Sequence, residues 1–275
     1  MLTGTLIVVG LAMAGFVGMC LLLYLKQDSF LFVPQRTDAA MAERWRTQRV
    51  EIRAGEQLIE GWWAEDPAAA SRAVVLYFGG NAEDVLVTAV TAQQIGARKL
   101  LVTNYRGYGK SGGRPGQVAL FADALAVYDY AAGQPGVTPA DIVVMGRSLG
   151  SGVATWVAAN RLVAGAILIT PYDSILSVAK NHYSVFPVRM LLRHPFPSHE
   201  LAAKATAPAL MIAAELDTVI PPVHARRLAA AWAGPKEIHE FAGMAHNNVE
   251  QSPGYYPLIR AFLQHVGPVR TPGAP

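Results

Sequence analysis

Cysteine and charge are both scarce in this chain of 275 residues. It holds one cysteine, Cys20, and 16% of its residues are Asp, Glu, Lys or Arg, against 52% hydrophobic residues. A single cysteine excludes an internal disulfide and leaves the redox compartment open. No Cys-x-x-Cys pair or Cys/His cluster occurs, so the sequence predicts no zinc site, and nothing in it implies another metal or an organic cofactor.

The chain also lacks a clustered basic patch and internal repeats. Its formal net charge is +3, but its Lys and Arg residues are scattered, whereas nucleic-acid-binding domains gather them on one face. We therefore expect no nucleic-acid partner. Beyond an N-terminal apolar run the chain keeps roughly 245 residues, which suits one large α/β domain or two small ones.

The N-terminal run from Leu2 to Leu25 carries no charged side chain, and Lys26 follows directly. About 20 apolar helical residues span a ~30 Å hydrocarbon core, so residues 1–26 are predicted to form a single-pass transmembrane anchor. A cleaved signal peptide is the main alternative, because Ala12-Met13-Ala14 resembles a cleavage site. However, the first residues hold no basic group and the apolar run continues past this tripeptide. A buried core helix is the third possibility.

The orientation of the anchor follows from the basic residues near it. Lys26 and Arg36 lie on its C-terminal side, and cytoplasmic flanks are enriched in Lys and Arg. This favours a cytoplasmic location for the rest of the chain. The excess of Arg over Lys, with abundant Ala and Gly, suggests a GC-rich genome, so we expect a bacterial inner membrane.

Beyond the anchor, short apolar runs bounded by turn residues have the composition of buried parallel strands. They are Ala73–Phe78, Lys99–Asn104, Asp141–Gly146, Gly165–Thr170, Ala209–Ala214 and Lys236–Phe241. The stretches with helical periodicity between them are Glu83–Ile95, Val118–Ala131, Leu149–Asn160, Pro222–Trp232 and Tyr255–Val266. This alternation predicts a mostly parallel, doubly wound sheet within a domain of residues 27–267. Arg49–Arg53 and Leu58–Ala64 predict an antiparallel hairpin at the sheet edge.

One interval breaks the alternation of strands and helices. Residues Pro171 to Pro208 separate two strands by more than one helix requires, and they carry several aromatic residues and prolines. We interpret residues 171–208 as a cap or lid inserted over a site, with a long packed surface loop as the alternative. Residues 268–275 are predicted to be a disordered tail.

A candidate nucleophile stands where a predicted strand turns into a helix. Gly146-Arg147-Ser148-Leu149-Gly150 matches Gly-x-Ser-x-Gly, and its position at a tight strand-to-helix turn is that of a nucleophile elbow. The flanking glycines relieve crowding in such a turn. The alternative is a serine at an ordinary helix N-cap.

A serine hydroxyl needs a base to remove its proton. His246 follows the last predicted strand in a loop of small residues. By contrast, His239 lies inside that strand, His265 lies late in the final helix, and His182, His194 and His199 lie in the cap interval. Asp217 follows the strand Ala209–Ala214 and is preferred to Glu215, because it lies deeper in its loop before an apolar Val-Ile-Pro step. The chain order Ser148, Asp217, His246 is the serine, acid, histidine order of a hydrolase triad.

An oxyanion hole needs two backbone N–H donors. Leu149, the residue after the candidate nucleophile, supplies one. Phe78-Gly79-Gly80-Asn81-Ala82 follows the first parallel strand, and its paired glycines let the backbone approach a substrate closely. We assign the second donor to the Asn81 amide, with Gly80 as the alternative donor. A simple glycine turn is the other interpretation.

Five segments together resemble a known family. They are Phe78-Gly79-Gly80-Asn81-Ala82, Asn104-Tyr105-Arg106-Gly107-Tyr108-Gly109-Lys110-Ser111, Gly146-Arg147-Ser148-Leu149-Gly150, Asp217-Thr218-Val219-Ile220-Pro221-Pro222 and Gly243-Met244-Ala245-His246-Asn247. As a set they resemble the small membrane-anchored α/β-hydrolases related to alpha/beta-hydrolase domain-containing protein 13. The resemblance covers residues 27 to 265. It departs where relatives have His-Gly and this chain has Gly79-Gly80.

The resemblance implies an α/β-hydrolase fold, an N-terminal anchor, a Ser-Asp-His triad and hydrolysis of ester or thioester bonds in lipid-like substrates. We expect Gly80, Tyr105 and Tyr172 to contact the substrate. The same triad also suits a peptidase or amidase, and a catalytically idle membrane scaffold is the remaining alternative. Fold alone does not decide the substrate.

Overall fold

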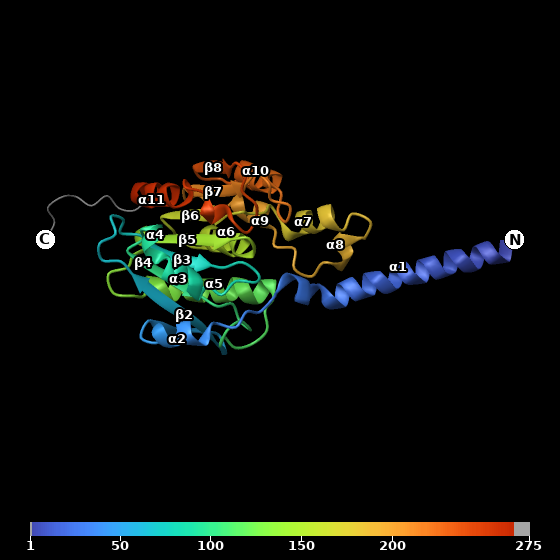
Figure 1. The fold of residues 1–275 in the computed structure, drawn as a ribbon, viewed down its shortest axis with the longest axis horizontal. Coiled ribbons are helices and arrows are strands. Elements are labelled where there is room, and N and C mark those ends of the chain that lie inside the picture. The colour runs from blue at the N-terminus through green and yellow to red at the C-terminus, as the bar shows by residue number, and fades with distance from the viewer. Residues whose placement is uncertain (1, 267–275) are drawn as a thin grey trace.

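The computed structural model describes residues 2–266, and it consists of a domain with one long helix projecting from it (Figure 1). That helix, α1 (Leu2–Leu31), is long and apolar enough to cross a membrane. It continues six residues past the predicted apolar run, through Lys26 and Asp28. The predicted tail, residues 268–275, lies outside the described residues.

An eight-stranded sheet forms the centre of the domain. Its strands are β1 (Arg49–Ala54), β2 (Gln57–Glu65), β3 (Val74–Phe78), β4 (Lys99–Thr103), β5 (Ile142–Arg147), β6 (Gly165–Ile169), β7 (Ala209–Ala214) and β8 (Lys236–Phe241). They are arranged in the order β1-β2-β4-β3-β5-β6-β7-β8. The β1–β2 hairpin pairs antiparallel with β4, and all later pairs are parallel. The predicted doubly wound sheet is confirmed, with the hairpin at one edge and β8 at the other.

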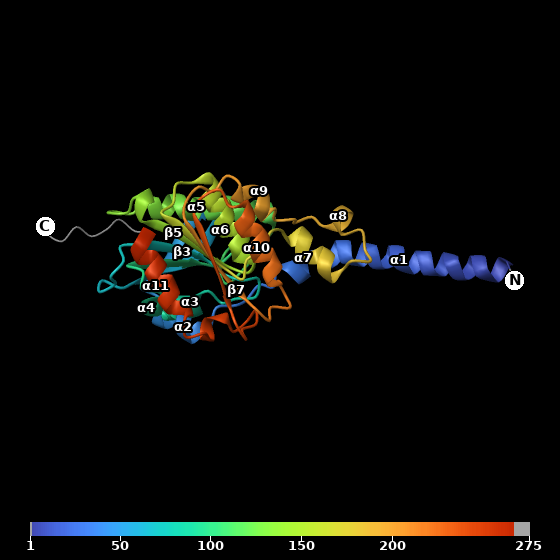
Figure 2. The same ribbon diagram turned by 90° about the horizontal axis from the view of Figure 1, so that it is seen from above.

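Helices cover both faces of the sheet (Figures 1 and 2). They are α2 (Ala39–Arg44), α3 (Leu86–Val90), α4 (Ala92–Ile95), α5 (Gln117–Ala132), α6 (Leu149–Asn160), α7 (Ile175–His182), α8 (Val188–Leu191), α9 (Ser198–Ala202), α10 (Pro222–Ala231) and α11 (Tyr255–Val266). The helix predicted over Glu83–Ile95 is wrong in its extent, because the helical pattern breaks at Thr91 into α3 and α4. The sequence patterns did not predict α2.

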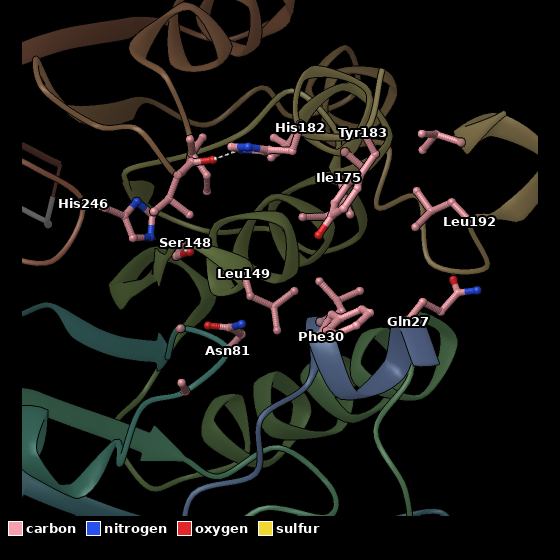
Figure 3. A pocket seen from close by; sticks show the side chains of 18 of the residues that line it. Gln27, Phe30, Asn81, Ser148, Leu149, Ile175, His182, Tyr183, Leu192 and His246 are labelled. Carbon is pink, nitrogen blue, oxygen red and sulfur yellow. Dashed lines mark hydrogen bonds between the residues drawn. The ribbon is translucent and has the colours of Figure 1, made fainter. Parts of the chain in front are cut away.

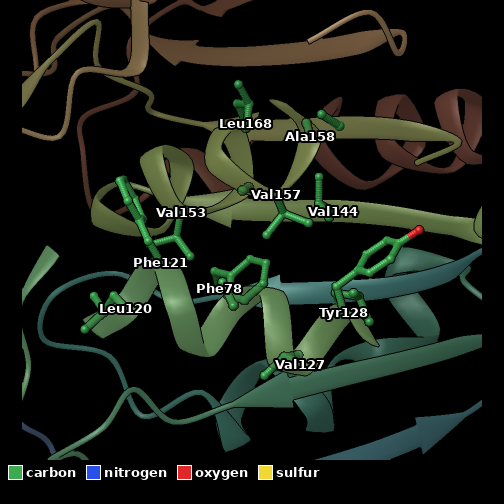
Figure 4. Close-up of a cluster of buried hydrophobic side chains, with 14 of the residues drawn as sticks. Phe78, Leu120, Phe121, Val127, Tyr128, Val144, Val153, Val157, Ala158 and Leu168 are labelled. Carbon is green, nitrogen blue, oxygen red and sulfur yellow. The ribbon is translucent and has the colours of Figure 1, made fainter. Parts of the chain in front are cut away.

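Two apolar clusters, one on each face, hold the layers together. Alternate residues of β3 point to opposite faces: Leu76 and Phe78 join the cluster under α5 and α6, while Val75 and Tyr77 join the cluster under α3 and α11. Figure 4 shows Phe78 between the side chains of α5 and α6. Burial on both faces explains why the central strands are continuous apolar runs instead of alternating ones.

The interval between β6 and β7 contains α7, α8 and α9. Of these, α9 packs against α6 and α10 in the body of the domain, and its Leu201 and Ala202 are buried. By contrast, α7 and α8 lie beside the end of α1 in both views (Figures 1 and 2). We therefore use "cap" below for residues 175–194, the part that stands apart from the body. The wider limits 171–208 and their lid role stay a prediction.

The start of α6 packs so closely on β3 that residue 150 has to be glycine. A Cβ at Gly150 would collide with the backbone carbonyl of Phe78. We expect Gly150→Ala to lower the free energy of unfolding by about 1–3 kcal/mol, because an overpacked site forces the backbone to shift. Thermal unfolding of the detergent-solubilised protein measures this.

Gly133→Ala is the matched control for that change. A Cβ there would lie 3.4 Å from the Asp129 carbonyl oxygen, an ordinary contact. We expect the control to change stability by no more than about 0.5 kcal/mol. Equal stability of the two variants would contradict the close-packing explanation.

Candidate active site

Ser148 occupies a strained turn between β5 and α6. Its backbone has φ 50° and ψ −116°, a region that non-glycine residues rarely adopt. The turn is held from the side, because the Ser148 N–H donates to the Ile169 carbonyl of β6 at 2.9 Å. A Cβ at Gly146 would collide with the Gly150 carbonyl. The two glycines of the motif therefore let the chain reverse tightly and present the serine hydroxyl above the sheet (Figure 3).

The structure brings Ser148, His246 and Asp217 together from three separate strand ends. His246 Nε2 lies 3.0 Å from the Ser148 hydroxyl oxygen, and His246 Nδ1 lies 2.6 Å from Asp217 Oδ2. Both His246 and Asp217 are buried. This is the geometry in which an imidazole can take a proton from a serine while a carboxylate orients it.

The Asp217 carboxylate is fixed by its own loop. Its Oδ1 accepts hydrogen bonds from the backbone N–H groups of Val219 at 2.9 Å and Ile220 at 2.7 Å, which leaves Oδ2 for His246. The competing acid, Glu215, points elsewhere and accepts a hydrogen bond from the Gly243 N–H at 2.8 Å. The structure therefore places Asp217, and not Glu215, against the imidazole.

The loop after β3 lies beside Ser148, as Figure 3 shows for Asn81. The Gly80 N–H is already engaged, because it donates to Glu83 Oε2 at 2.8 Å. The Asn81 carbonyl accepts from the Tyr108 hydroxyl at 2.8 Å and from the Val33 N–H at 3.1 Å. With Gly80 occupied, Asn81 is the donor candidate that remains in this loop, opposite Leu149 at the start of α6.

Glu83 organises this loop, and sequence reasoning missed it. Its carboxylate accepts hydrogen bonds from the Tyr77 hydroxyl at 2.7 Å and the Thr88 hydroxyl at 3.0 Å, besides the Gly80 N–H. Burial, and secondarily the Glu83 charge, raises the pKa of Tyr77 well above its usual value, so Tyr77 stays a neutral donor. A glutamate three residues after Gly80 is the spacing of a capping interaction, which could have identified it.

Arg147 connects the two loops that flank Ser148. Its guanidinium lies 3.6 Å from the Glu83 carboxylate and donates to the His246 carbonyl at 3.3 Å. Burial lowers its pKa, but Glu83 and Tyr77 outweigh that effect, and the pKa rises above its ordinary value. The variable second position of the Gly-x-Ser-x-Gly pattern therefore has a positioning role here.

Two of the three expected substrate contacts are wrong. Tyr105 and Tyr172 are buried and do not line the cavity next to Ser148, whereas Gly80 does. Tyr105 donates its hydroxyl to the Gly79 carbonyl at 2.7 Å, and Tyr172 donates to the Leu149 carbonyl at 3.1 Å. Both hydroxyls thus hold backbone carbonyls of the two segments that flank the candidate oxyanion site. Burial raises the pKa of each, so both remain protonated donors.

A cavity of about 590 Å³ leads away from Ser148 and His246. Apolar side chains of α7 and α8 form one wall, among them Ile175, Val178 and Leu191. The opposite wall comes from the end of α1, through Leu23, Gln27, Phe30 and Leu31. Figure 3 shows Ser148 and His246 at one end, with Gln27 and Leu192 at the other. No sequence pattern indicates that α1 contributes to the site. Among residues 2–266, no three His, Cys, Asp or Glu side chains group as metal ligands would.

Comparisons with known proteins find serine hydrolases and an esterase fold among the similar chains. A family model described as "Serine hydrolase" matches residues 134–265. An uncharacterised protein of Mycobacterium tuberculosis is 38% identical over 218 residues, which cover 78% of this chain and 77% of that protein. The lysophosphatidylserine lipase ABHD12 of Macaca fascicularis is 29% identical over 234 residues, covering 73% of this chain and 58% of the relative. The Pyrococcus furiosus esterase Pf2001 superposes with a TM-score of 0.66 at 16% identity, covering 86% of this chain and 100% of that chain.

The position of Glu83 generates a prediction about rate. We expect Glu83→Gln to lower kcat for p-nitrophenyl butyrate about tenfold with KM nearly unchanged, because a loosened loop weakens an interaction made mainly in the transition state. Steady-state kinetics of the purified protein separates the two constants.

Glu56→Gln removes the same charge at an exposed position and is the control. It should leave both constants unchanged. A Glu83→Gln protein with unaltered kcat, or with a changed KM alone, would show that Glu83 does not position the loop.

Proposed function

The chain belongs to the α/β-hydrolase family, and we propose that it is a serine esterase or thioesterase acting on lipid-like acyl substrates. The observation that carries this proposal is the contact of Ser148 with His246 and of His246 with Asp217 at the end of an apolar cavity. The similarities support the wider family and leave the predicted branch around alpha/beta-hydrolase domain-containing protein 13 as a proposal.

In the proposed reaction, the Ser148 oxygen attacks the acyl carbonyl while His246 Nε2 takes the serine proton. Asp217 holds the imidazole and stabilises its charged form. The backbone N–H groups of Leu149 and Asn81 stabilise the oxygen that becomes negative. His246 then gives its proton to the leaving alcohol or thiol. Water, activated by the same imidazole, releases the acyl group and restores Ser148.

The character of the cavity supports an acyl substrate. Its walls are mainly aliphatic and aromatic side chains, and most of its polar groups belong to the loops around Ser148, with Gln27 at the other end. One relative is named as a lysophosphatidylserine lipase, which fits a lipid-like substrate here. A peptide would need polar partners along its backbone, and the cavity wall formed by α1 and the cap offers chiefly Gln27 and His182.

The proposed place of action is the membrane surface. One described helix, α1, can cross a membrane by length and composition, and we propose that it is an uncleaved anchor. Lys26 and Arg36 on its C-terminal side favour a cytoplasmic active site. The anchor would keep the cavity close to lipid, because α1 forms one of the cavity walls.

A panel of three substrates tests the reaction class. We expect turnover of p-nitrophenyl esters and of an acyl thioester, and at least about 100-fold slower turnover of the matching p-nitroanilide, because the amide is the harder bond to cleave. Ser148→Ala should lower kcat by about 10⁴-fold or more. The exposed Ser184→Ala is the matched control and should behave as the unaltered protein.

Two outcomes would overturn the proposal in different ways. Anilide turnover as fast as ester turnover would identify an amidase or peptidase. A folded protein that hydrolyses none of the three substrates would identify a non-catalytic membrane protein.

A further inference from the structure

The cap lies along the anchor helix at two separate contacts. At the first, Gln27 is buried: its Nε2 donates to the Leu191 carbonyl at 2.9 Å, and its Oε1 accepts from the Arg193 N–H at 2.7 Å. At the second, the rings of Phe16 and Phe186 stack with centroids 5.5 Å apart. Residues 16 and 27 of one helix are about 16 Å apart along its axis. The cap therefore follows α1 back toward its N-terminal part.

If α1 spans a membrane, as proposed above, the second contact sets the depth of the cap in that membrane. The uncharged run of α1 ends at Leu25, so a membrane span has to lie before Lys26. A 20-residue span that ends at Leu25 places Phe16 about 14 Å inside the hydrocarbon, and one that ends at Leu21 places it about 8 Å inside. Because Phe186 stacks on Phe16, the tip of the cap reaches the same depth.

The composition of the cap suits that position. Val185 and Met190 at its tip are 75% and 84% exposed to solvent. No acidic residue occurs between Asp173 and Glu200. The exposed charged side chains of the cap are Lys180, Arg189 and Arg193, of which Arg193 is paired with Asp28 of α1. Exposed apolar residues flanked by cations alone are typical of segments that lie in the interface of an anionic membrane.

The cavity connects this position to Ser148. Side chains of α1, such as Leu23 and Phe30, line it together with Tyr183 and Phe186 of the cap. Figure 3 shows Phe30 and Tyr183 on opposite sides of the space that ends at Ser148. The gap between anchor and cap is therefore a path from the membrane to the nucleophile.

We propose that residues 183–191 insert into the leaflet beside α1, and that the cavity takes its acyl chain directly from this leaflet instead of from water. The second half of this inference rests on the proposed function. Insertion of the cap does not require catalysis, so insertion and the supply of the acyl chain from the leaflet can be tested separately.

Fluorescence quenching measures the insertion. With Cys20→Ala in place, no native cysteine remains, and Met190→Cys carries a single NBD fluorophore. In vesicles of phosphatidylcholine and phosphatidylglycerol that contain doxyl-labelled phosphatidylcholine, we expect NBD at position 190 to be quenched at least about twofold, as for a side chain at the acyl boundary. Val185→Cys provides a second site with the same expectation.

Leu162→Cys is the matched control, because Leu162 is 78% exposed and follows the far end of α6. It lies about 20 Å along this helix from Ser148 and should show no quenching. Equal, weak quenching at positions 185, 190 and 162 would overturn the proposed insertion.

Activity tests the path from the leaflet. We expect Met190→Asp to lower hydrolysis of p-nitrophenyl palmitate carried in the vesicles about tenfold, because a charge at the insertion depth is costly. Hydrolysis of p-nitrophenyl butyrate in water should stay within about twofold, since residue 190 is outside the cavity wall. Leu162→Asp should affect neither ester. Equal effects of Met190→Asp on both esters, or none, would overturn supply from the leaflet.

A protein that hydrolyses neither ester would refute the proposed function instead. The quenching experiment would still decide whether the cap inserts, because it needs no turnover.

Discussion

The active-site geometry depends on one constraint, the strained turn at Ser148. A serine with φ 50° persists only where its surroundings hold it, and here the Ile169 carbonyl of β6 and the close approach of Gly150 to β3 do so. The turn lies at the edge where all the parallel strands end. For that reason the loop after β3, the acid after β7 and the imidazole after β8 can meet the serine, although they are far apart in the chain.

A second feature links the site to the anchor. The Asn81 carbonyl accepts hydrogen bonds from Val33, just beyond α1, and from Tyr108 in the loop after β4. One peptide of the candidate oxyanion loop is thus hydrogen-bonded to the segment that follows α1. Phe32 is buried in the core next to it. Helix α1 therefore forms part of the cavity wall, and the segment after it holds the candidate oxyanion loop, so α1 is more than a flexible tether.

Much of the fold could be predicted because the buried parallel strands are continuous apolar runs. The candidate site residues could be located because each follows a predicted strand: Ser148 and Asp217 follow buried apolar strands, and His246 follows the exposed edge strand β8. The misses have physical causes. The charges of Lys26 and Asp28 end the apolar run and so hide the continuation of α1. The helix continues past them, and its Asp28 is paired with Arg193 of the cap at 2.7 Å, a contact that the sequence does not show. Glu83 appears in the sequence only as the first residue of the predicted helix Glu83–Ile95, because its contacts with Tyr77 and Gly80 depend on the fold. The sequence does not show that the hydroxyls of Tyr105 and Tyr172 donate to backbone carbonyls, so it predicts them as substrate contacts.

If His246 activates Ser148, covalent labelling of the serine has to depend on the histidine. Purified protein is treated with a fluorophosphonate, and the intact mass is followed over time for the unaltered chain, Ser148→Ala and His246→Ala. We expect one adduct on the unaltered protein, none on Ser148→Ala, and labelling slowed by about 10²-fold or more in His246→Ala. A folded protein that forms no adduct, or one that Ser148→Ala leaves fully labelled, would contradict this activation.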